Sequence, residues 1–486
     1  MVKRKRQAAG NEKGIKRKTQ GKDQKRSSKM EAYEELLVWA KDKGIILNGV
    51  APRRIPGRGM GIVATKPLKA DTTILTVPSK TLRTYETVHP SIARALPKDI
   101  TIHGLLAADL AFDPSPSAKY RQWNAVCPTR DDVWDSLPLT WDHQLRKFLT
   151  KRALDLLLKQ EAKFEKDWTM VQQSSLLSLR SDGEEDESTK EDGKLNKTIT
   201  RDDYLYAWLL VNTRTFYHET PKTKKFKKED RMVLQPVADL FNHTSYDPSA
   251  DEKEGNKKTC SVAFSPTAFT ITTTRPYIEG EEVYICYGNH SNDFLLIEYG
   301  FLFDENVWDE VCIDDAILPL LDQAQPQLPQ QPAKKVTRRL NERGKKDPKS
   351  QEQQPPKSAK DLLEEYDFLG NYNLDPRNPT GCYRTQVALR AVSALADNSG
   401  PEGEKKFRAF VDYGQDPWED SEEEQKKLNA MLAQALKRWR GDVVDEMVAG
   451  LKRLEEVDRK CHRDMLLMRW RQVGRMVDRA LEELEG

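Results

Sequence analysis

The chain has 486 residues and a formal net charge of +2, and 32% of its residues are charged against 37% that are hydrophobic. That length predicts two or three domains, and the low hydrophobic share predicts disordered segments beside the folded ones. No apolar run reaches the roughly 18 residues that a membrane span needs. A secretory signal is not expected either, because no apolar region follows the basic start of the chain.

The six cysteines are scattered along the chain and form no C-x-x-C pair. Such spacing favours a reducing compartment and argues against a zinc cluster. We therefore expect a cytoplasmic or nuclear protein, or one found in both places, with no bound metal and no membrane partner.

Residues 1–29 carry twelve Lys or Arg against two Asp or Glu, which leaves a net charge near −8 for the rest of the chain. They lack apolar periodicity and are expected to form a disordered basic arm. The arm suits contact with an importin or with RNA phosphates, and a solubilising tail explains it about equally well. Two further low-complexity stretches are interpreted as linkers, the acidic 181–194 and the Pro/Gln/Lys-rich 323–360. Three ordered blocks remain, at roughly 30–178, 200–320 and 361–486.

The first ordered block begins with strands and continues with helices. Residues 31–44 have apolar side chains at helical spacing before a glycine, which predicts a short helix. Residues 61–78 contain two β-branched runs around a Pro-containing turn, which predicts two strands paired with each other. Residues 137–173 keep apolar positions three and four apart, which predicts helix.

The second block is predicted to be a helix followed by strands, and the third to be helical. Residues 202–216 are predicted to form a helix. Apolar and polar residues alternate in 260–265 and in 268–273 on either side of a short turn, which predicts a β-hairpin. A further strand is expected within 280–288. In 428–454 one helical face is expected to be core, formed by Leu428, Met431, Leu432, Leu436, Trp439, Val443, Met447, Leu451 and Leu454. The stretch 461–483 continues in the same way.

Three separated motifs carry polar and glycine residues that can build a site. They are GRGMGIVA at 57–64, VADLFNHTSYDP at 237–248 and EEVYICYGNHSNDFLLIEYGFLFD at 281–304. Each has an ordinary structural explanation when taken alone, namely a tight turn, a capped loop and two strand ends with buried tyrosines. Their order along the chain is more informative than any one of them.

That order, RGxG, then DLFNH, then YxCYG followed by SN and YGF, resembles the SET-domain methyltransferases. The similarity is greatest to the subfamily typified by the Rubisco large-subunit lysine methyltransferase, over roughly residues 30–486. The resemblance implies an α+β protein, with a SET-domain β-fold that contains a pseudoknot, a helical insertion and an all-helical C-terminal substrate-binding domain. The implied boundaries are 30–303 for the SET domain with its insertion at about 104–225, 304–360 for a connector, and 361–486 for the helical domain.

The resemblance also implies a binding site for S-adenosylmethionine (AdoMet). By their match to the family motifs, the cofactor-binding residues would be Arg58, Gly59, Met60, Arg214, Asn242, His243, Tyr287 and Phe301. In this assignment Arg214 pairs with the cofactor carboxylate, Asn242 and His243 read the adenine edge, and Phe301 packs beside it. Tyr287 would be the catalytic residue, and the substrate-lysine channel would be lined by Phe216, Asp239 and Tyr299. Many relatives carry an acidic residue where Arg58 stands.

These residues suit methyl transfer to an amine, which needs alignment and a neutral nucleophile more than acid–base catalysis. The resemblance implies an AdoMet-dependent protein-lysine N-methyltransferase that acts as a monomer on a non-histone protein, with a ribosomal protein or a translation elongation factor as the expected substrate. Two alternatives stay open. One is a non-catalytic SET scaffold that docks on ribosomes or RNA, and the other is a protein-histidine methyltransferase.

Overall fold

The structure, a computed structural model, describes nine stretches of the chain: 32–56, 58–112, 119–178, 199–245, 260–324, 357–397, 401–413, 421–454 and 459–486. The predicted basic arm at 1–29, the acidic linker at 181–194 and most of the linker at 323–360 lie outside these stretches. Within them, no helix combines the length and the apolarity that a membrane crossing requires.

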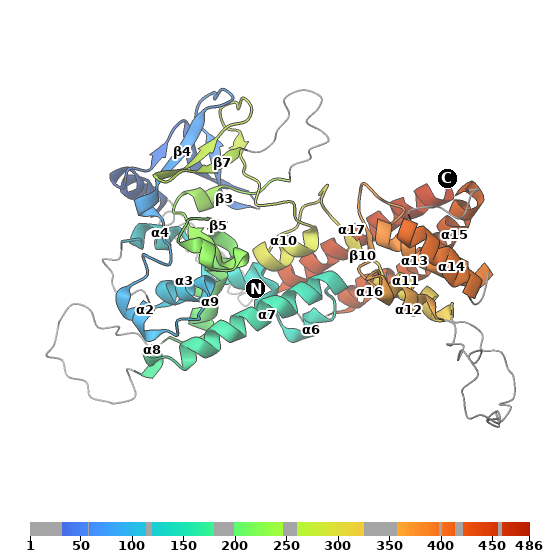
Figure 1. Cartoon of the computed structure of the whole chain (residues 1–486). Coiled ribbons are helices and arrows are strands. Elements are labelled where there is room, and N and C mark those ends of the chain that lie inside the picture. Colours follow the sequence, from blue (N-terminus) through green and yellow to red (C-terminus); the bar gives the residue numbers. More distant parts are fainter. Residues whose placement is uncertain are drawn as a thin grey trace, which may run out of the picture. The chain divides into compact units, whose positions relative to one another are not determined.

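The chain divides into two compact units. Unit 1 comprises residues 1–142, 155–290 and 294–301, and unit 2 comprises 143–154, 291–293 and 302–486. The predicted boundaries near residues 303 and 361 remain predictions. The α+β class and the helical C-terminal region are confirmed, and the orange and red helices α13 to α17 of Figure 1 make up most of that region.

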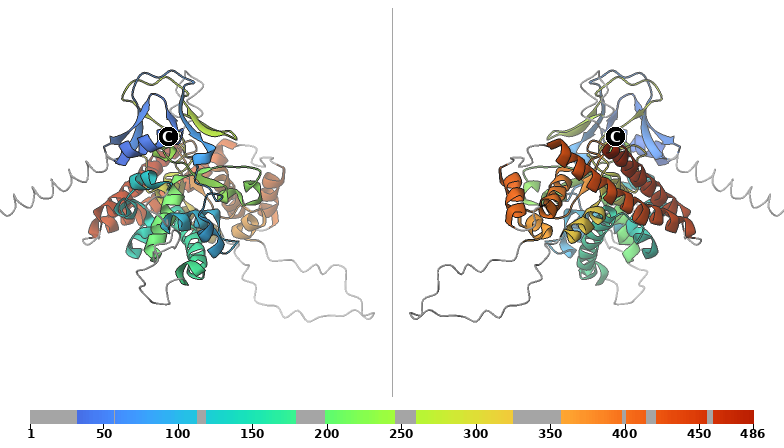
Figure 2. Two further views of the ribbon diagram at one scale, coloured as in Figure 1. Left: turned by 90° about the vertical axis from the view of Figure 1, so that its left-hand side faces the viewer. Right: turned by 90° about the vertical axis from the view of Figure 1, so that its right-hand side faces the viewer.

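Unit 1 contains three small sheets. The four-stranded sheet has the order β1 (Ile46–Leu47), β4 (Thr73–Pro78), β8 (Ala268–Thr272) and β7 (Ser261–Phe264). The three-stranded sheet has the order β2 (Val50–Ile55), β3 (Gly59–Ala64) and β9 (Glu282–Val283), and the third sheet pairs β5 (Thr215–Tyr217) with β6 (Met232–Leu234). In both views of Figure 2 the blue N-terminal strands lie beside yellow-green strands from residues 261–272, in keeping with the pairing of β4 and β8.

The expected hairpin of 260–273 is confirmed, since β7 pairs with β8 in antiparallel register. The expected pairing within 61–78 is wrong. Both runs form strands, but β3 pairs with β2 and β9, whereas β4 pairs with β1 and β8. The connection between β3 and β4 is longer than the two to five residues of a tight hairpin, so the turn does not hold the two strands together.

Helices cover the remainder of unit 1. Among the described residues they are a helix over 32–42, as predicted for 31–44, and α2 (Pro90–Ala95), α3 (Ile102–Ala111), α4 (Arg121–Val126), α5 (Arg130–Ser136), α8 (Ser175–Ser178) and α9 (Arg201–Arg214). Two more, α7 (Lys151–Gln172) and α10 (Asn292–Tyr299), begin in unit 2 and continue in unit 1. The helix predicted for 202–216 is thus confirmed as α9, which starts at a capping box formed by Thr200 and Asp203.

Unit 2 is built mainly from helices. They are α6 (His143–Arg146), α11 (Asp314–Gln323), α12 (Ala359–Glu365), α13 (Tyr383–Asp397), α14 (Pro401–Tyr413), α15 (Ser421–Trp439), α16 (Glu446–Arg453) and α17 (Lys460–Glu485). A short ladder pairs β10 (Val311–Cys312) with β11 (Asn373–Leu374).

The helical face predicted for 428–454 holds along α15, is interrupted at Val443 and is buried again at Leu451. Leu428, Leu432 and Leu436 are fully buried. Beyond them Val444 is buried to 1% exposure, whereas the predicted Val443 is only half-buried. The segment Arg440–Asp445 is π-helical, and its wider turn delays the return of the chain to the same face.

Candidate functional site

The Asn-His segment lies beside the segment that ends in Tyr287. Asn242 and His243 follow the short 3-10 turn Ala238–Leu240, and His243 forms a parallel bridge with Ile285. The bridge consists of two bonds, from Thr244 N to the Ile285 carbonyl and from Ile285 N to the Asn242 carbonyl, each 3.1 Å long. Residues about forty positions apart in sequence therefore form one backbone ladder in unit 1.

The turn before this ladder is held in a strained conformation. Val237 is fully buried and has a φ of 76°, which a β-branched residue rarely adopts. Such outliers persist where the surrounding structure over-determines them, and they cluster at functional sites. The strain at Val237 therefore supports the Asn-His segment as a site.

A charged network joins the Asn-His segment to the glycine-rich turn. The Asn242 Nδ2 donates to Glu282 Oε1 at 2.7 Å, and Arg58 Nη2 lies 2.7 Å from Glu282 Oε2. Arg58 Nη1 also donates to the Tyr284 hydroxyl, which in turn donates to Glu282 Oε2 at 2.7 Å. The side-chain Nδ2 of Asn242 is a donor and is engaged by Glu282. The side-chain Oδ1 of Asn242 is the atom that can accept a hydrogen bond from a ligand.

Gly61 makes room for this network. A β-carbon at that position would lie 2.6 Å from Glu282 Oε1 and 2.7 Å from Asn242 Nδ2. At Gly59, which has a φ of +76°, a β-carbon would meet open space instead. The two glycines thus serve different needs, close approach at Gly61 and left-handed backbone at Gly59.

Four predicted site residues meet in one aromatic cluster. The rings of His243 and Tyr287 are stacked with centroids 4.9 Å apart, and Tyr299 lies 5.1 Å from Tyr287. Phe301 closes the cluster at 6.2 Å from His243 and 6.3 Å from Tyr299. The structure therefore brings together residues that belong to two different motifs of the sequence.

Hydrogen bonds fix two of these rings. The Tyr287 hydroxyl donates to the Phe241 carbonyl at 2.7 Å, and the Tyr287 backbone N–H donates to His243 Nδ1 at 3.1 Å. Burial lowers the pKa of His243 to about 4, so the imidazole is neutral at physiological pH and its Nδ1 can accept. Burial also raises the pKa of Tyr287 and raises that of Tyr299 to about 12, so both phenols keep their protons.

Arg214 and Asp239 form a buried ion pair. Arg214 Nη1 lies 2.7 Å from Asp239 Oδ2, and their side chains are 16% and 1% exposed. Trp123 Nε1 also donates to Asp239 Oδ2, at 2.9 Å. Arg214 Nε and Asp239 Oδ1 are buried and have no hydrogen-bond partner among the described residues. Burial raises the pKa of Asp239, although the neighbouring guanidinium opposes that shift.

The remaining predicted residues lie on nearby strands. Met60 is on β3 opposite Arg54 of β2. Phe216 is on β5, opposite Val233 of β6, and its ring packs edge-on against Phe269 with centroids 5.3 Å apart. Among the described contacts, none joins Phe216 to the aromatic cluster, so its place in a lysine channel remains a prediction.

Sequence reasoning missed several residues of this site. Glu282 joins Arg58 to Asn242, Trp123 holds Asp239, and His290 stacks on Phe294 with centroids 4.1 Å apart. Glu282 directly precedes the apolar Val-Tyr-Ile-Cys-Tyr run. An acidic residue at the start of such a predicted strand is the sequence signal that could have identified it as a site residue. No local pattern marks Trp123, because its partner is more than a hundred residues away.

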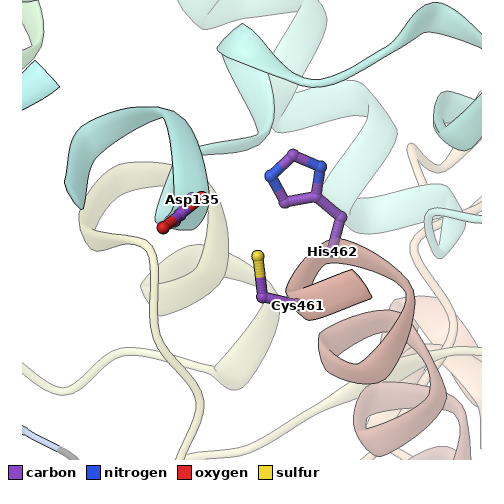
Figure 3. Close-up of side chains that lie close together, drawn as sticks. All are labelled: Asp135, Cys461 and His462. Carbon is purple, nitrogen blue, oxygen red and sulfur yellow. The ribbon is translucent and has the colours of Figure 1, made fainter. Parts of the chain in front are cut away.

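Among the described residues, one group of metal-ligating side chains lies close together. Cys461 and His462 lie in the first turn of α17, and Asp135 lies on α5 (Figure 3). Cys461 and His462 belong to unit 2 and Asp135 to unit 1. Neither unit alone therefore supplies all three side chains of a ligand set.

Comparisons with known proteins agree with the motif order. Residues 59–288 match the SET domain family. The chain is 24% identical over 280 residues to the ribosomal lysine N-methyltransferase set11 of Schizosaccharomyces pombe. This alignment covers 57% of the present chain and 63% of that protein. It is 25% identical over 295 residues to the actin-histidine N-methyltransferase of Danio rerio. That alignment covers 58% of the present chain and 44% of the relative. In both cases the match spans less than two thirds of the relative.

Two solved structures have a fold similar to that of this chain over most of its length. The crystal structure of the SET domain of LSMT bound to lysine and AdoHcy matches with a TM-score of 0.55 at 16% identity, covering 94% of this chain and 91% of that one. The structure of Rubisco LSMT bound to AdoMet matches with a TM-score of 0.54. The expected SET-domain fold is therefore confirmed, and residues 59–288 are the part of the chain that is similar to the SET domain family.

Proposed function

We propose that the chain is an AdoMet-dependent protein-lysine N-methyltransferase that acts on a non-histone protein, with a ribosomal protein or a translation elongation factor as its substrate. The observation that carries the proposal is the aromatic cluster of His243, Tyr287, Tyr299 and Phe301 next to Asn242 within a SET domain. Relatives named as ribosomal lysine methyltransferases support the substrate class.

The residues present suit AdoMet, which would supply an activated methyl group. The side-chain Oδ1 of Asn242 offers an acceptor for an amino group, since only Nδ2 of that amide is engaged by Glu282. Arg214 keeps one guanidinium nitrogen, Nε, without a partner among the described residues, and a guanidinium is well suited to a carboxylate. The open space at Gly59 leaves the backbone of the turn approachable.

The aromatic cluster suits an amine nucleophile. An ammonium has no lone pair, so the substrate lysine must lose its proton before it can react. Buried aromatic surroundings disfavour the charged form and lower the pKa of an amine. The protonated hydroxyl of Tyr299 would orient the neutral nitrogen, while Tyr287, fixed through Phe241 and His243, would hold the wall of the channel.

Histidine as the methyl acceptor is the second candidate. It is favoured by the relatives named actin-histidine N-methyltransferase, which match at 25–26% identity. An imidazole is already neutral at physiological pH and needs less desolvation than lysine. A third candidate, the SET scaffold that docks on ribosomes or RNA without catalysis, predicts no methyl transfer at all.

The wider setting of the protein is also part of this proposal. We expect a monomer in the cytoplasm, the nucleus or both, with the basic arm 1–29 meeting RNA or an importin, and with no membrane partner and no metal requirement. Deleting residues 1–29 should weaken salt-sensitive RNA binding if the arm contributes to it.

The proposal is tested with the full chain, radiolabelled AdoMet, and separated ribosomal-protein and elongation-factor fractions. We expect label in one protein, recovered as methyl-lysine after hydrolysis, and strongly reduced label with the Tyr287→Phe variant at an unchanged melting temperature. Label recovered as methyl-histidine would establish the second candidate. Binding of AdoMet with no label in any fraction would favour the non-catalytic scaffold.

A further inference from the structure

The connection between β5 and β6 carries a dense run of lysines. Residues 222–228, which we call the basic loop, read KTKKFKK and contain five lysines. All five lysine side chains are exposed, whereas Thr223 is buried and Phe226 is half-buried. The loop belongs to unit 1 and contains a 3-10 turn, Thr223–Lys225, which Phe226 and Lys227 separate from the start of a second one, Lys228–Asp230.

The basic loop is braced from inside by Arg231. Its Nε donates to the Phe226 carbonyl at 3.1 Å, its Nη2 donates to the Lys224 carbonyl at 3.0 Å, and its Nη1 pairs with Glu219 at 2.5 Å. These bonds leave the guanidinium turned toward the loop backbone rather than toward solvent. The two bonds to backbone carbonyls fix the backbone conformation of the basic loop at Lys224 and Phe226.

Two further contacts fix the same loop. The Thr223 hydroxyl accepts from Thr220 N at 2.7 Å, and the Phe226 ring packs edge-on against Tyr85 with centroids 5.3 Å apart. The apolar ring is therefore turned inward, and the lysines are the side chains that the loop offers to solvent. A loop held in this way loses little conformational entropy when it binds.

Neighbouring acids neutralise only part of the loop. Lys222 pairs with Glu86 at 2.7 Å, and Lys224 lies 3.5 Å from Glu219. Lys225, Lys227 and Lys228 have no carboxylate partner among the described residues. Outside residues 1–29 the chain is acidic overall, with a net charge near −8. The basic loop is thus a local positive surface on an acidic background.

We propose that the basic loop is a binding surface for RNA backbone phosphates. Lysine ammonium groups are compact charges on flexible stems, which suits phosphate contacts that do not read sequence. A membrane surface fits less well, because interfacial binding needs exposed apolar side chains beside the charges, and the only ring of the loop packs against Tyr85.

The position of the loop links this surface to the predicted substrate channel. The hairpin that carries it begins directly after Arg214 and includes Phe216, a predicted channel residue. RNA on the loop would therefore accompany a protein substrate taken from a ribonucleoprotein. This link rests on the proposed function, whereas the binding of RNA by the loop does not.

The test is fluorescence anisotropy of a labelled 20-nucleotide single-stranded RNA, titrated with the full chain at several salt concentrations and without AdoMet. The variant is Lys225→Ala/Lys227→Ala/Lys228→Ala. The matched control is Lys159→Ala/Lys163→Ala/Lys166→Ala, which removes the same charge from exposed positions on α7. Both variants are first compared with the wild type by melting temperature.

Each phosphate contact on a single strand contributes roughly 0.7 to the slope of log K against log salt concentration, so removing three contacts should reduce that slope by about 2. At moderate salt the affinity for the RNA should fall about tenfold or more. The control should keep the wild-type slope. An unchanged slope in the loop variant, or an equal loss in the control, would overturn the proposal. Displacement of the RNA by polyglutamate at equal charge would point to an acidic protein partner instead, and would also count against it.

Discussion

At the scale of single residues, Gly61 is where the smallest change has the most specific expected effect. Gly61→Ala would place a β-carbon within 2.7 Å of both Glu282 Oε1 and Asn242 Nδ2, so the hydrogen bond between them must break. A hydrogen bond to a charged group contributes about 1.5–3 kcal/mol, so the Kd for AdoMet should rise at least about tenfold. Calorimetric titration measures this.

The matched control for Gly61 is Gly441→Ala, because an added β-carbon at Gly441 meets nothing within 4 Å. This control should bind AdoMet as the wild type does. Equal affinity of the Gly61→Ala variant and the wild type would contradict a role for the Asn242–Glu282 pair in the pocket.

Asp239 is the residue whose loss should cost the most stability near the site. Asp239→Asn leaves the guanidinium of Arg214 buried without a counter-charge, and breaking a buried pair in this way costs about 3–5 kcal/mol. Urea unfolding should show that loss. Glu165→Gln, which removes a partner of Arg201 where both side chains are 46% exposed, should have little effect, since exposed pairs contribute about 1 kcal/mol or less.

At the scale of elements, the contact between α3 and α9 makes stability depend on pH. His103 of α3 stacks on Trp208 of α9 with centroids 3.9 Å apart, and its Nε2 donates to the Trp208 carbonyl at 2.9 Å. Burial lowers the pKa of His103 to about 3, from the ordinary histidine value of about 6.5. Between these two values the unfolded chain binds a proton that the folded chain does not, so stability falls as the pH decreases below 6.5.

The expected loss from His103 is about 2 kcal/mol between pH 7 and pH 5, at 1.36 kcal/mol for each unit below 6.5. His103→Phe should be less stable at pH 7, because it lacks the bond to Trp208. Its pH dependence over this range should be smaller than that of the wild type by the same amount. Parallel stability curves for the two proteins, measured by urea unfolding, would contradict this account.

A second element-scale prediction concerns α17 and the start of α10. Arg469 donates to Asp293 and Asp309 at 2.7 Å each, and all three side chains are buried. Arg469→Leu would leave two buried carboxylates without a cation, and we expect unit 2 to lose about 3–5 kcal/mol of unfolding free energy. Arg475→Leu, at an exposed position of the same helix, should leave the denaturant midpoint nearly unchanged.

At the scale of the whole molecule, local patterns in the sequence predicted elements better than the contacts between them. The apolar spacing of 202–216 and the alternation of 260–273 correspond to α9 and to the β7–β8 hairpin. The pairing within 61–78 was wrong because β3 pairs with the preceding β2 and the distant β9, whereas β4 pairs with β1 and the distant β8. Val443 was placed in the core because periodicity assumes 3.6 residues per turn, and the π-helical segment does not keep that spacing.

The same division holds for the site. The motif order was enough to predict that Asn242, His243 and Tyr287 come together, and the SET-domain fold agrees with it. Trp123 and Glu282 could not be inferred as partners of Asp239 and Asn242, because those bonds join segments that are forty or more residues apart. Long-range hydrogen bonds leave no periodic trace in a sequence.

The most direct test of this account is calorimetric titration of AdoMet into the purified full chain, with the Asn242→Ala variant measured beside it. The account predicts saturable binding at one site per chain, and a much weaker or undetectable signal from the variant at an unchanged melting temperature. Absence of binding by the folded wild type, with and without the ribosomal fraction present, would contradict it. So would equal binding by the wild type and the variant.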